Sequence, residues 1–303
     1  MDILDLINIL KEKFTKIRFF VRVYHINNDI IIYNDVDITL KYDKTLFNDK
    51  NINYMVKKIM DDLKKKIEEK YRISNEMVSV IIPNYNNDIF LKNVISKILA
   101  NTYKNIEIII IDDKSTDKSI SIINENITDR IKLYENKENF GTYYARNKGI
   151  LMSKGGYILF VDGDDYIEPT YIENMVNSLK NSDRRVWGYG IRFERVFLNN
   201  KLEVMHQNNT KSYNILFKRK IFNYLGFFQD SRYGADSEFI YRAKIYHYPI
   251  KYNNSDNSIQ YHANTLKNKN LTQIINWNKR RQYIQDAKNN ISLRNYIEMA
   301  YLD

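Results

Sequence analysis

The stretch from residue 78 to residue 117 reads VSVIIPNYNNDIFLKNVISKILANTYKNIEIIIIDDKSTD, and it decides the fold class. Residues 78–83 and 106–111 are almost wholly apolar, which is typical of strands buried on both faces of a sheet. Residues 90–99 lie between these runs and carry apolar side chains at helical spacing. A strand, a helix and a second strand in this order predict one unit of a parallel sheet.

The same alternation continues toward the C-terminus. Residues 131–134 and 157–161 predict two further strands, and residues 142–152 predict a helix between them. Another helix is expected to begin at residues 115–117 (STD), because Ser, Thr and Asp are preferred helix caps. In such α/β sheets, ligands bind at the carboxyl ends of the strands. The polar residues that follow the strands are therefore expected to face one crevice.

The composition narrows the class of protein. The 303 residues are 28% charged and 44% hydrophobic, which is the balance of a globular chain. There is no cysteine, so disulfides, thiolate zinc sites and a cysteine nucleophile are excluded. The 47 Lys and Arg exceed the 37 Asp and Glu, giving a net charge of +10. This surplus suits nucleic acid, an anionic membrane or a phosphorylated small molecule, or serves solubility alone.

The first 75 residues predict a small α+β module. It begins with a short helix, continues with strand-like runs at 19–25 and 30–33, and ends with an amphipathic helix around residues 56–67. Residues 1–10 lack a basic leader, and no apolar run is long enough to span a membrane. A soluble protein of the cytoplasm or another intracellular space is expected.

The last third of the chain changes pattern again. It predicts a hairpin, then a helix, two short strands and a terminal helix. The corresponding residues are 186–197 with 202–205, then 235–246, then 250–252 and 258–262, and finally 271–287.

Three aspartates follow the strand at 157–161 in the turn DGDD, which is residues 162–165. Carboxylates this close repel one another unless a cation or many donors compensate. Oxygen ligands at a strand end suit magnesium or manganese, which binds a substrate diphosphate as well. The alternative is a polar turn that caps a helix beginning at Pro169.

Other candidates lie after the neighbouring strands. Asp112 and Asp113 could accept hydrogen bonds from a base or ribose, or belong to an ordinary helix cap. Pro83 is expected to end strand pairing and to fix a loop whose Tyr85 could stack on a base. Tyr85 is otherwise a core or rim tyrosine. Arg146, one turn inside a predicted helix, could bind phosphate or belong to a solvated cationic face.

Together these segments resemble the family 2 glycosyltransferases, which have the GT-A fold and bind nucleotide-diphospho-sugars. The matching segments are 82–86 (IPNYN), 111–117 (IDDKSTD), 139–149 (NFGTYYARNKG) and 160–169 (FVDGDDYIEP), in the order of the family. The resemblance is specific from about residue 78 to 169 and looser to about 262. It implies an α/β fold with a mostly parallel, Rossmann-like sheet flanked by helices. The chain then divides into a 1–75 accessory module, a 76–265 GT-A domain and a 266–303 helical extension.

The resemblance also implies roles in donor binding. Pro83, Tyr85 and Asp113 would border the nucleotide base, with Asp112 beside them. Arg146 would approach the base or the diphosphate.

Within the DGDD turn, Asp162 would contact the ribose or the metal ion. Asp164 would be the main protein ligand of Mn²⁺ or Mg²⁺, and Asp165 is expected at the rim.

A catalytic carboxylate is implied in the second half of the chain. Asp236 occupies the position of the Asp in a family Glu-Asp pair, where Ala235 replaces the Glu and Glu238 is a candidate substitute. Such a carboxylate can deprotonate the attacking acceptor hydroxyl. Asp236 could also act as a helix N-cap. His262 lies in a late segment, QYHANT, in which the family's His reaches the metal or diphosphate, although a lone His is more often structural.

The function implied is that of a metal-dependent, inverting hexosyltransferase. A UDP-sugar is the expected donor, a glycan, protein or lipid carries the acceptor hydroxyl, and a homodimer is left open. One alternative is a nucleotidyltransferase, but the residues after Pro83 lack the expected Gly-rich phosphate loop. A second is a non-catalytic nucleic-acid-binding protein, but the lysines are scattered and the specific motifs are acidic. The third alternative is a transferase fold that has lost activity and serves as a scaffold, but the intact acidic motifs argue against it.

Overall fold

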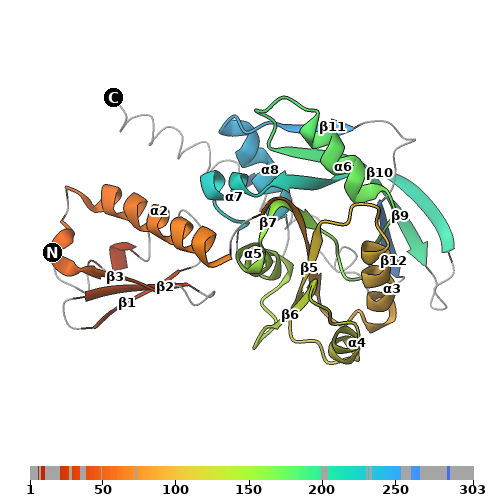
Figure 1. Ribbon diagram of the computed structural model, residues 1–303, viewed down its shortest axis with the longest axis horizontal. Helices are drawn as coiled ribbons and strands as arrows, with labels where there is room; N and C mark the ends of the chain where they lie inside the picture. Colours follow the sequence, from red (N-terminus) through yellow and green to blue (C-terminus); the bar gives the residue numbers. More distant parts are fainter. Residues whose placement is uncertain are drawn as a thin grey trace. The chain divides into compact units, whose positions relative to one another are not determined.

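The computed structural model describes residues 6, 8–10, 21–26, 29–34, 39–48, 50–71, 74–198, 204–229, 231, 234–253, 261–266 and 285–286. The chain forms two compact units, drawn in Figure 1. The first comprises Met1–Ser74 with Phe222–Phe227, and the second comprises Asn75–Ile221 with Phe228–Asp303. The terminal helix expected at 271–287 lies outside the described residues, apart from 285–286.

The first unit contains an antiparallel sheet and one long helix (Figure 1). Strands β1 (Val21–Ile26), β2 (Asp29–Asn34) and β3 (Thr39–Asp43) pair in sequence order, and β3 leads into the short 3₁₀ helix η1 (Lys44–Leu46). Helix α2 (Ile52–Tyr71) follows. Alternate residues of β2 are buried, as are apolar residues on one face of α2, so both elements contribute to the core of this unit. The sequence pattern predicted β1, β2 and α2 but missed β3.

The second unit is built on a nine-stranded sheet. Its order is β6 (Ile131–Glu135), β5 (Ile106–Asp112), β4 (Ser74–Asn84), β7 (Gly155–Phe160), β10 (Val204–Lys218), β9 (Gly188–Leu198), β12 (Tyr261–Leu266) and β8 (Tyr166–Ile167), with β11 (Ile250–Asn253) paired to β9. Strands β4, β5 and β6 are parallel, as predicted. Strand β10 is antiparallel to both β7 and β9. The antiparallel part therefore begins beyond the strands that carry the acidic motifs.

Helices accompany this sheet in the order expected for an α/β fold (Figure 1). They are α3 (Asp88–Leu99), α4 (Ser119–Glu125), α5 (Thr142–Met152), α6 (Tyr171–Lys180) and α8 (Ala235–Ile245). Helix α7 (Lys220–Leu225) begins in the second unit and continues in the first.

Both faces of the central strands are covered. The side chains of Val78, Val80 and Ile82 join a buried core with the apolar faces of α3 and α6. Ile81 points the other way, toward α5, where a Cβ on Gly149 would lie 2.3 Å from its Cγ2. This two-sided burial explains why the strands read as continuous apolar runs.

Two element boundaries differ from the predictions. Pro83 does not end strand pairing: it lies opposite Ile111 in the parallel ladder, and β4 continues to Asn84. A proline lacks only the N–H, so the ladder can continue through neighbouring groups. Residues 115–117 do not begin a helix, because the Ser115 hydroxyl donates to Asp112 Oδ1 at 2.6 Å and α4 begins at Ser119.

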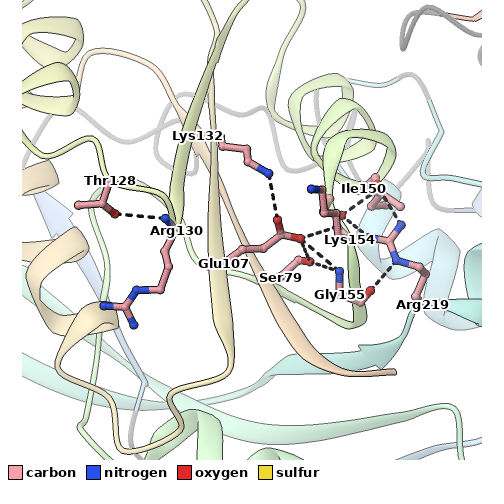
Figure 2. A network of polar contacts seen from close by, with 10 residues as sticks. Ser79, Glu107, Thr128, Arg130, Lys132, Ile150, Lys154, Gly155 and Arg219 are labelled. Atoms are coloured by element: carbon pink, nitrogen blue, oxygen red, sulfur yellow. Dashed lines mark hydrogen bonds and ion pairs between the residues drawn. The ribbon is translucent and has the colours of Figure 1, made fainter. Parts of the chain in front are cut away.

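A buried polar network joins the amino ends of the central strands, as Figure 2 shows. Glu107, at the start of β5, accepts hydrogen bonds from the Ser79 hydroxyl at 2.7 Å and from the Gly155 amide at 3.2 Å. Its other carboxylate oxygen lies 3.6 Å from Lys132 Nζ. The buried Arg219 donates to the Gly155 carbonyl at 2.6 Å. These contacts fix the strand ends opposite to those at which ligands bind in such sheets.

No helix in the described part of the chain combines the length and the apolar character needed to cross a membrane.

Candidate active site

The polar segments that follow β4 and β5 meet at one edge of the sheet. Asn84 lies opposite Asp112 in the ladder, and its side-chain amide donates to Asp112 Oδ1 at 2.8 Å. The backbone continues this pairing, since the Asp113 amide donates to the Asn84 carbonyl at 2.8 Å. The segment after β7 joins them through the Val161 amide, which donates to the Ile81 carbonyl at 3.1 Å.

The paired carboxylates after β5 are buried and hold neighbouring loops in place. Asp112 is 1% exposed and accepts from the Ser115 amide at 2.8 Å. Asp113 is 3% exposed and accepts from Asn136 Nδ2 at 2.9 Å and from the Gly141 amide at 2.6 Å. Both side chains thus shape the edge of the sheet, while their contact with a nucleotide stays a prediction.

The loop after β4 presents an aromatic ring at this edge. Tyr85 is 46% exposed, whereas Pro83 is buried within β4. Asn86, with a positive φ of 55°, accepts from the Thr116 amide at 2.8 Å and donates its own amide to the Ser115 hydroxyl at 2.9 Å. The two loops are therefore cross-linked, and Tyr85 remains open to stack on a ligand.

The DGDD turn packs closely on the end of β4. A Cβ on Gly163 would lie 2.7 Å from Asn87 Nδ2 and 2.8 Å from Asn84 Oδ1, so glycine permits this approach. Asp165 is not at the rim, as the sequence suggested, but buried. It accepts from the Tyr261 hydroxyl at 2.6 Å and from the Asn264 amide at 2.9 Å, because the turn folds against β12.

The electrostatics of the turn are unfavourable for three carboxylates alone. Burial, and then the charge of Asp162, raise the pKa of Asp164 to about 7. Burial and the neighbouring Asp164 likewise raise the pKa of Asp165 well above its ordinary value. A cation bound to the turn would relieve this repulsion.

Arg146 is a cation that bonds directly to this turn. Its Nη2 donates to Asp162 Oδ1 at 2.7 Å, and its guanidinium carbon lies 5.3 Å from the centre of the Phe160 ring. Burial lowers the pKa of Arg146, but Asp162, Tyr143 and Asp236 together outweigh this effect, and the net shift is upward. The side chain is 15% exposed, which excludes the alternative of a solvated cationic face. Its Nε is a buried donor that has no hydrogen-bond partner among the described residues.

Asp236 lies in the first turn of α8 and is held by a tyrosine. Gly234, in the left-handed region at φ 77°, occupies the N-cap position, so the expectation that Asp236 caps the helix is wrong. Instead Asp236 Oδ1 accepts from the Tyr143 hydroxyl at 2.8 Å.

Glu238, the other base candidate, is fully buried. Its two oxygens accept from Arg242 Nε and Nη2 at 3.1 and 2.9 Å, which favours a structural ion pair.

His262 is enclosed by carboxylates. Its Nε2 lies 3.0 Å from Glu168 Oε1, its Nδ1 contacts Glu194, and its ring stacks on Tyr166 with centres 4.3 Å apart. This arrangement leaves neither ring nitrogen open to a metal ion.

Several residues of this edge were missed by the sequence reasoning. They are Tyr143, which bonds Asp236, Asn136, which bonds Asp113, and Tyr261 and Asn264, which hold Asp165. For Tyr143 one signal was available, because it lies three residues before Arg146 and thus on the same face of the predicted helix. The others come from segments whose pairing only the fold determines.

The residues of the DGDD turn fit a divalent cation that is bound jointly by the protein and the substrate. Within the described ranges, no group of three or more His, Cys, Asp or Glu side chains is arranged to hold a metal. Mg²⁺ and similar ions commonly bind one or two carboxylates and complete their shell with water and substrate phosphates. Asp162 and Asp164, two carboxylates on one turn, fit that type of site.

The sequence and the fold of this chain are similar to those of known proteins. The model of the family "Glycosyl transferase family 2" matches residues 79–247. An uncharacterized glycosyltransferase of Haemophilus influenzae is 45% identical over 104 residues, which are 33% of this chain and 41% of the relative. An Escherichia coli protein, UDP-Glc:alpha-D-GlcNAc-diphosphoundecaprenol beta-1,3-glucosyltransferase WfaP, is 42% identical over 105 residues, which are 35% of this chain and 42% of the relative. The matches thus span about two-fifths of these relatives.

Two solved structures share the fold. The first is Staphylococcus aureus TarS 1–349 in complex with UDP-GlcNAc, with a TM-score of 0.54 and 19% identity over 65% of this chain and 60% of that one. The second is the mannosyltransferase PcManGT of Pyrobaculum calidifontis in complex with GDP-Man and Mn²⁺, with a TM-score of 0.52 and 19% identity over 72% of this chain and 64% of that one. The fold is GT-A, and the chain belongs to glycosyl transferase family 2.

Proposed function

We propose that this protein transfers a hexose, with inversion, from a nucleoside-diphosphate sugar to the hydroxyl of a glycan, protein or lipid, with the help of Mn²⁺ or Mg²⁺. The observation that carries the proposal is the DGDD turn, where burial and the charge of Asp162 raise the pKa of Asp164 to about 7. Such a turn suits a cation that is shared with a diphosphate. The proposed donor is a UDP-sugar, in line with the ligand of TarS and the name of the E. coli relative. Because PcManGT is in complex with GDP-Man, a GDP-sugar is tested as a second candidate donor.

The donor would lie along the edge formed by the strand ends. Tyr85 offers an exposed ring for the base, and the Pro83, Asp112 and Asp113 positions border it. The buried Nε of Arg146 has no partner in the part of the chain that the structure describes, while its Nη2 bonds Asp162, so this side chain can orient both the turn and a phosphate group. Asp162 and Asp164 would hold the ion, which when bound neutralises charge on the leaving diphosphate.

Asp236 is the proposed general base. In a direct displacement the acceptor oxygen forms a bond to the anomeric carbon while the bond from that carbon to the diphosphate breaks. The bonding electron pair leaves with the diphosphate, and the acceptor proton passes to the Asp236 carboxylate. A single displacement of this kind inverts the anomeric centre. Asp236 is preferred over Glu238, whose two oxygens are already bonded to Arg242.

Donor binding by the intact chain tests the proposal directly. Thermal unfolding is measured with UDP-glucose, UDP-GlcNAc, GDP-mannose and a CMP-sugar, each with and without Mn²⁺. We expect one nucleotide class to raise the melting temperature, and to do so much more strongly with the ion. Stabilisation that is equal with and without Mn²⁺ would overturn the metal dependence. No stabilisation by any sugar nucleotide would overturn the donor class.

A further inference from the structure

One helix reaches two separate parts of the candidate site. Tyr143 and Arg146 lie one turn apart on α5. The hydroxyl of Tyr143 donates to Asp236 Oδ1 at 2.8 Å, and Arg146 Nη2 donates to Asp162 Oδ1 at 2.7 Å. The same helix therefore contacts the proposed base on α8 and the first aspartate of the DGDD turn.

A third residue of α5 ties down the chain that leads into α8. Asn147 is fully buried, and its side-chain amide both donates to the Phe228 carbonyl and accepts from the Phe228 amide, each at 3.0 Å. The ring of Phe228 in turn packs on Tyr143, with centres 5.8 Å apart. The position of Tyr143 relative to this segment is thus fixed by packing and by two hydrogen bonds.

We propose that Tyr143 is a positioning residue for sugar transfer, holding the carboxylate of Asp236 in the orientation and the ionised state needed to accept the acceptor proton. The inference rests on the proposed function, because Asp236 has to be the base. Tyr143 acts only through Asp236 and need not touch either substrate. A hydrogen bond donated to a carboxylate favours its charged form and removes rotational freedom from it.

The surroundings keep the Tyr143 hydroxyl a donor. Burial, and then the negative charge of Asp236, raise the pKa of Tyr143, so the phenol stays protonated around neutral pH. The charged groups around the pair are Arg146 from α5, which faces the Tyr143 ring at 5.5 Å, and Asp162, to which Arg146 is bonded. On α8 itself, Glu238 is neutralised by Arg242.

The test is the full-length Tyr143→Phe variant, which removes one oxygen and keeps the ring. With the UDP-sugar that stabilises the protein and water as the acceptor, release of UDP measures turnover. We expect kcat to fall about ten- to a hundredfold while the KM of the donor stays within about twofold, since a hydrogen bond to a charged group is lost.

Tyr144→Phe is the matched control. Tyr144 is the neighbouring tyrosine on α5, and its ring lies 4.5 Å from that of Phe140, a contact that phenylalanine preserves. We expect its kcat and its KM for the donor to match those of the wild type. An equal loss in Tyr144→Phe would show a general effect on α5 and would overturn the positioning role.

A double-mutant cycle with Asp236→Asn separates this inference from the proposed function. If Tyr143 acts through Asp236, adding Tyr143→Phe to Asp236→Asn should cost no further activity. Fully additive losses would overturn the inference and leave Asp236 as base. If Asp236→Asn alone keeps wild-type turnover, the proposed base is wrong, and the role of Tyr143 falls with it.

Discussion

Acidic side chains have opposite surroundings at the two ends of the parallel strands. At the amino ends, Glu107 is surrounded by donors: the Ser79 hydroxyl, two backbone amides and the ammonium of Lys132. At the carboxyl ends, three aspartates share the four residues of the DGDD turn, and Asp164 keeps a raised pKa. A buried carboxylate with enough donors stabilises the fold, whereas one that repels its neighbours is suited to a bound cation. Predictions about the two ends therefore differ in kind.

The largest expected effect is on activity, at the carboxyl ends. Asp164→Asn should lower Mn²⁺-dependent turnover about a hundredfold or more, because a bound ion contributes several kcal/mol to such a reaction. The folded state should be no less stable, since the change removes a buried charge that its surroundings disfavour. Turnover is measured by UDP release, and Mn²⁺ binding by its effect on thermal unfolding.

The matched control for this change is Asp129→Asn, which alters an exposed aspartate of the same domain. It should leave both turnover and the response to Mn²⁺ unchanged. Wild-type turnover in Asp164→Asn would remove this aspartate from the ion site.

The next effect concerns stability, at the amino ends. Glu107→Gln keeps the shape of the side chain but loses the ion pair with Lys132 and turns an NH₂ group toward donors. We expect the free energy of unfolding to fall by about 1–3 kcal/mol, which is a Tm decrease of several degrees. Donor affinity of the folded protein should be unchanged.

Glu135→Gln is the control here, because this exposed glutamate ends the neighbouring strand β6. It should unfold like the wild type. A Glu107→Gln variant with normal stability but impaired donor binding would contradict the division of roles between the two ends.

The sequence predicted the parts of the molecule that depend on local pattern. Apolar runs identified β4 to β7, and the strand order places Asp112 and Asn84 side by side because neighbouring parallel strands end at the same edge. The pattern of the first 75 residues likewise predicted α2. Such features follow from burial alone.

The rest depends on contacts between distant segments. Tyr143 and Asp236 are 93 positions apart, and Asp165 is bonded to Asn264, 99 positions away. The position of Asp165 therefore had to be corrected from rim to interior, since no local pattern shows that β12 covers the turn. Similarly, Ser115 resembled a helix cap, but Asp112 takes its hydroxyl. Side chains with several potential partners are assigned only by the fold.

The smallest effect is expected on the pH dependence of stability without added metal. This measurement compares the carboxyl ends and the amino ends of the parallel strands in one experiment. The pKa of Asp164 is about 7 in the folded protein, above its ordinary value of 3.8, so the folded state holds a proton that the unfolded state has released. Stability must then fall as pH rises toward and through 7, by about 1 kcal/mol between pH 6 and 7.5. Chemical unfolding of the wild type should show this loss, and Glu107→Gln should retain it. Asp164→Asn should show a smaller loss, because only the raised pKa of Asp165 remains. Mn²⁺ should oppose the loss, because the ion binds the ionised carboxylate and stabilises it where the proton leaves. If the stability of Asp164→Asn has the same pH slope as that of the wild type, another carboxylate is responsible for the slope. Asp165 is then the next residue to change.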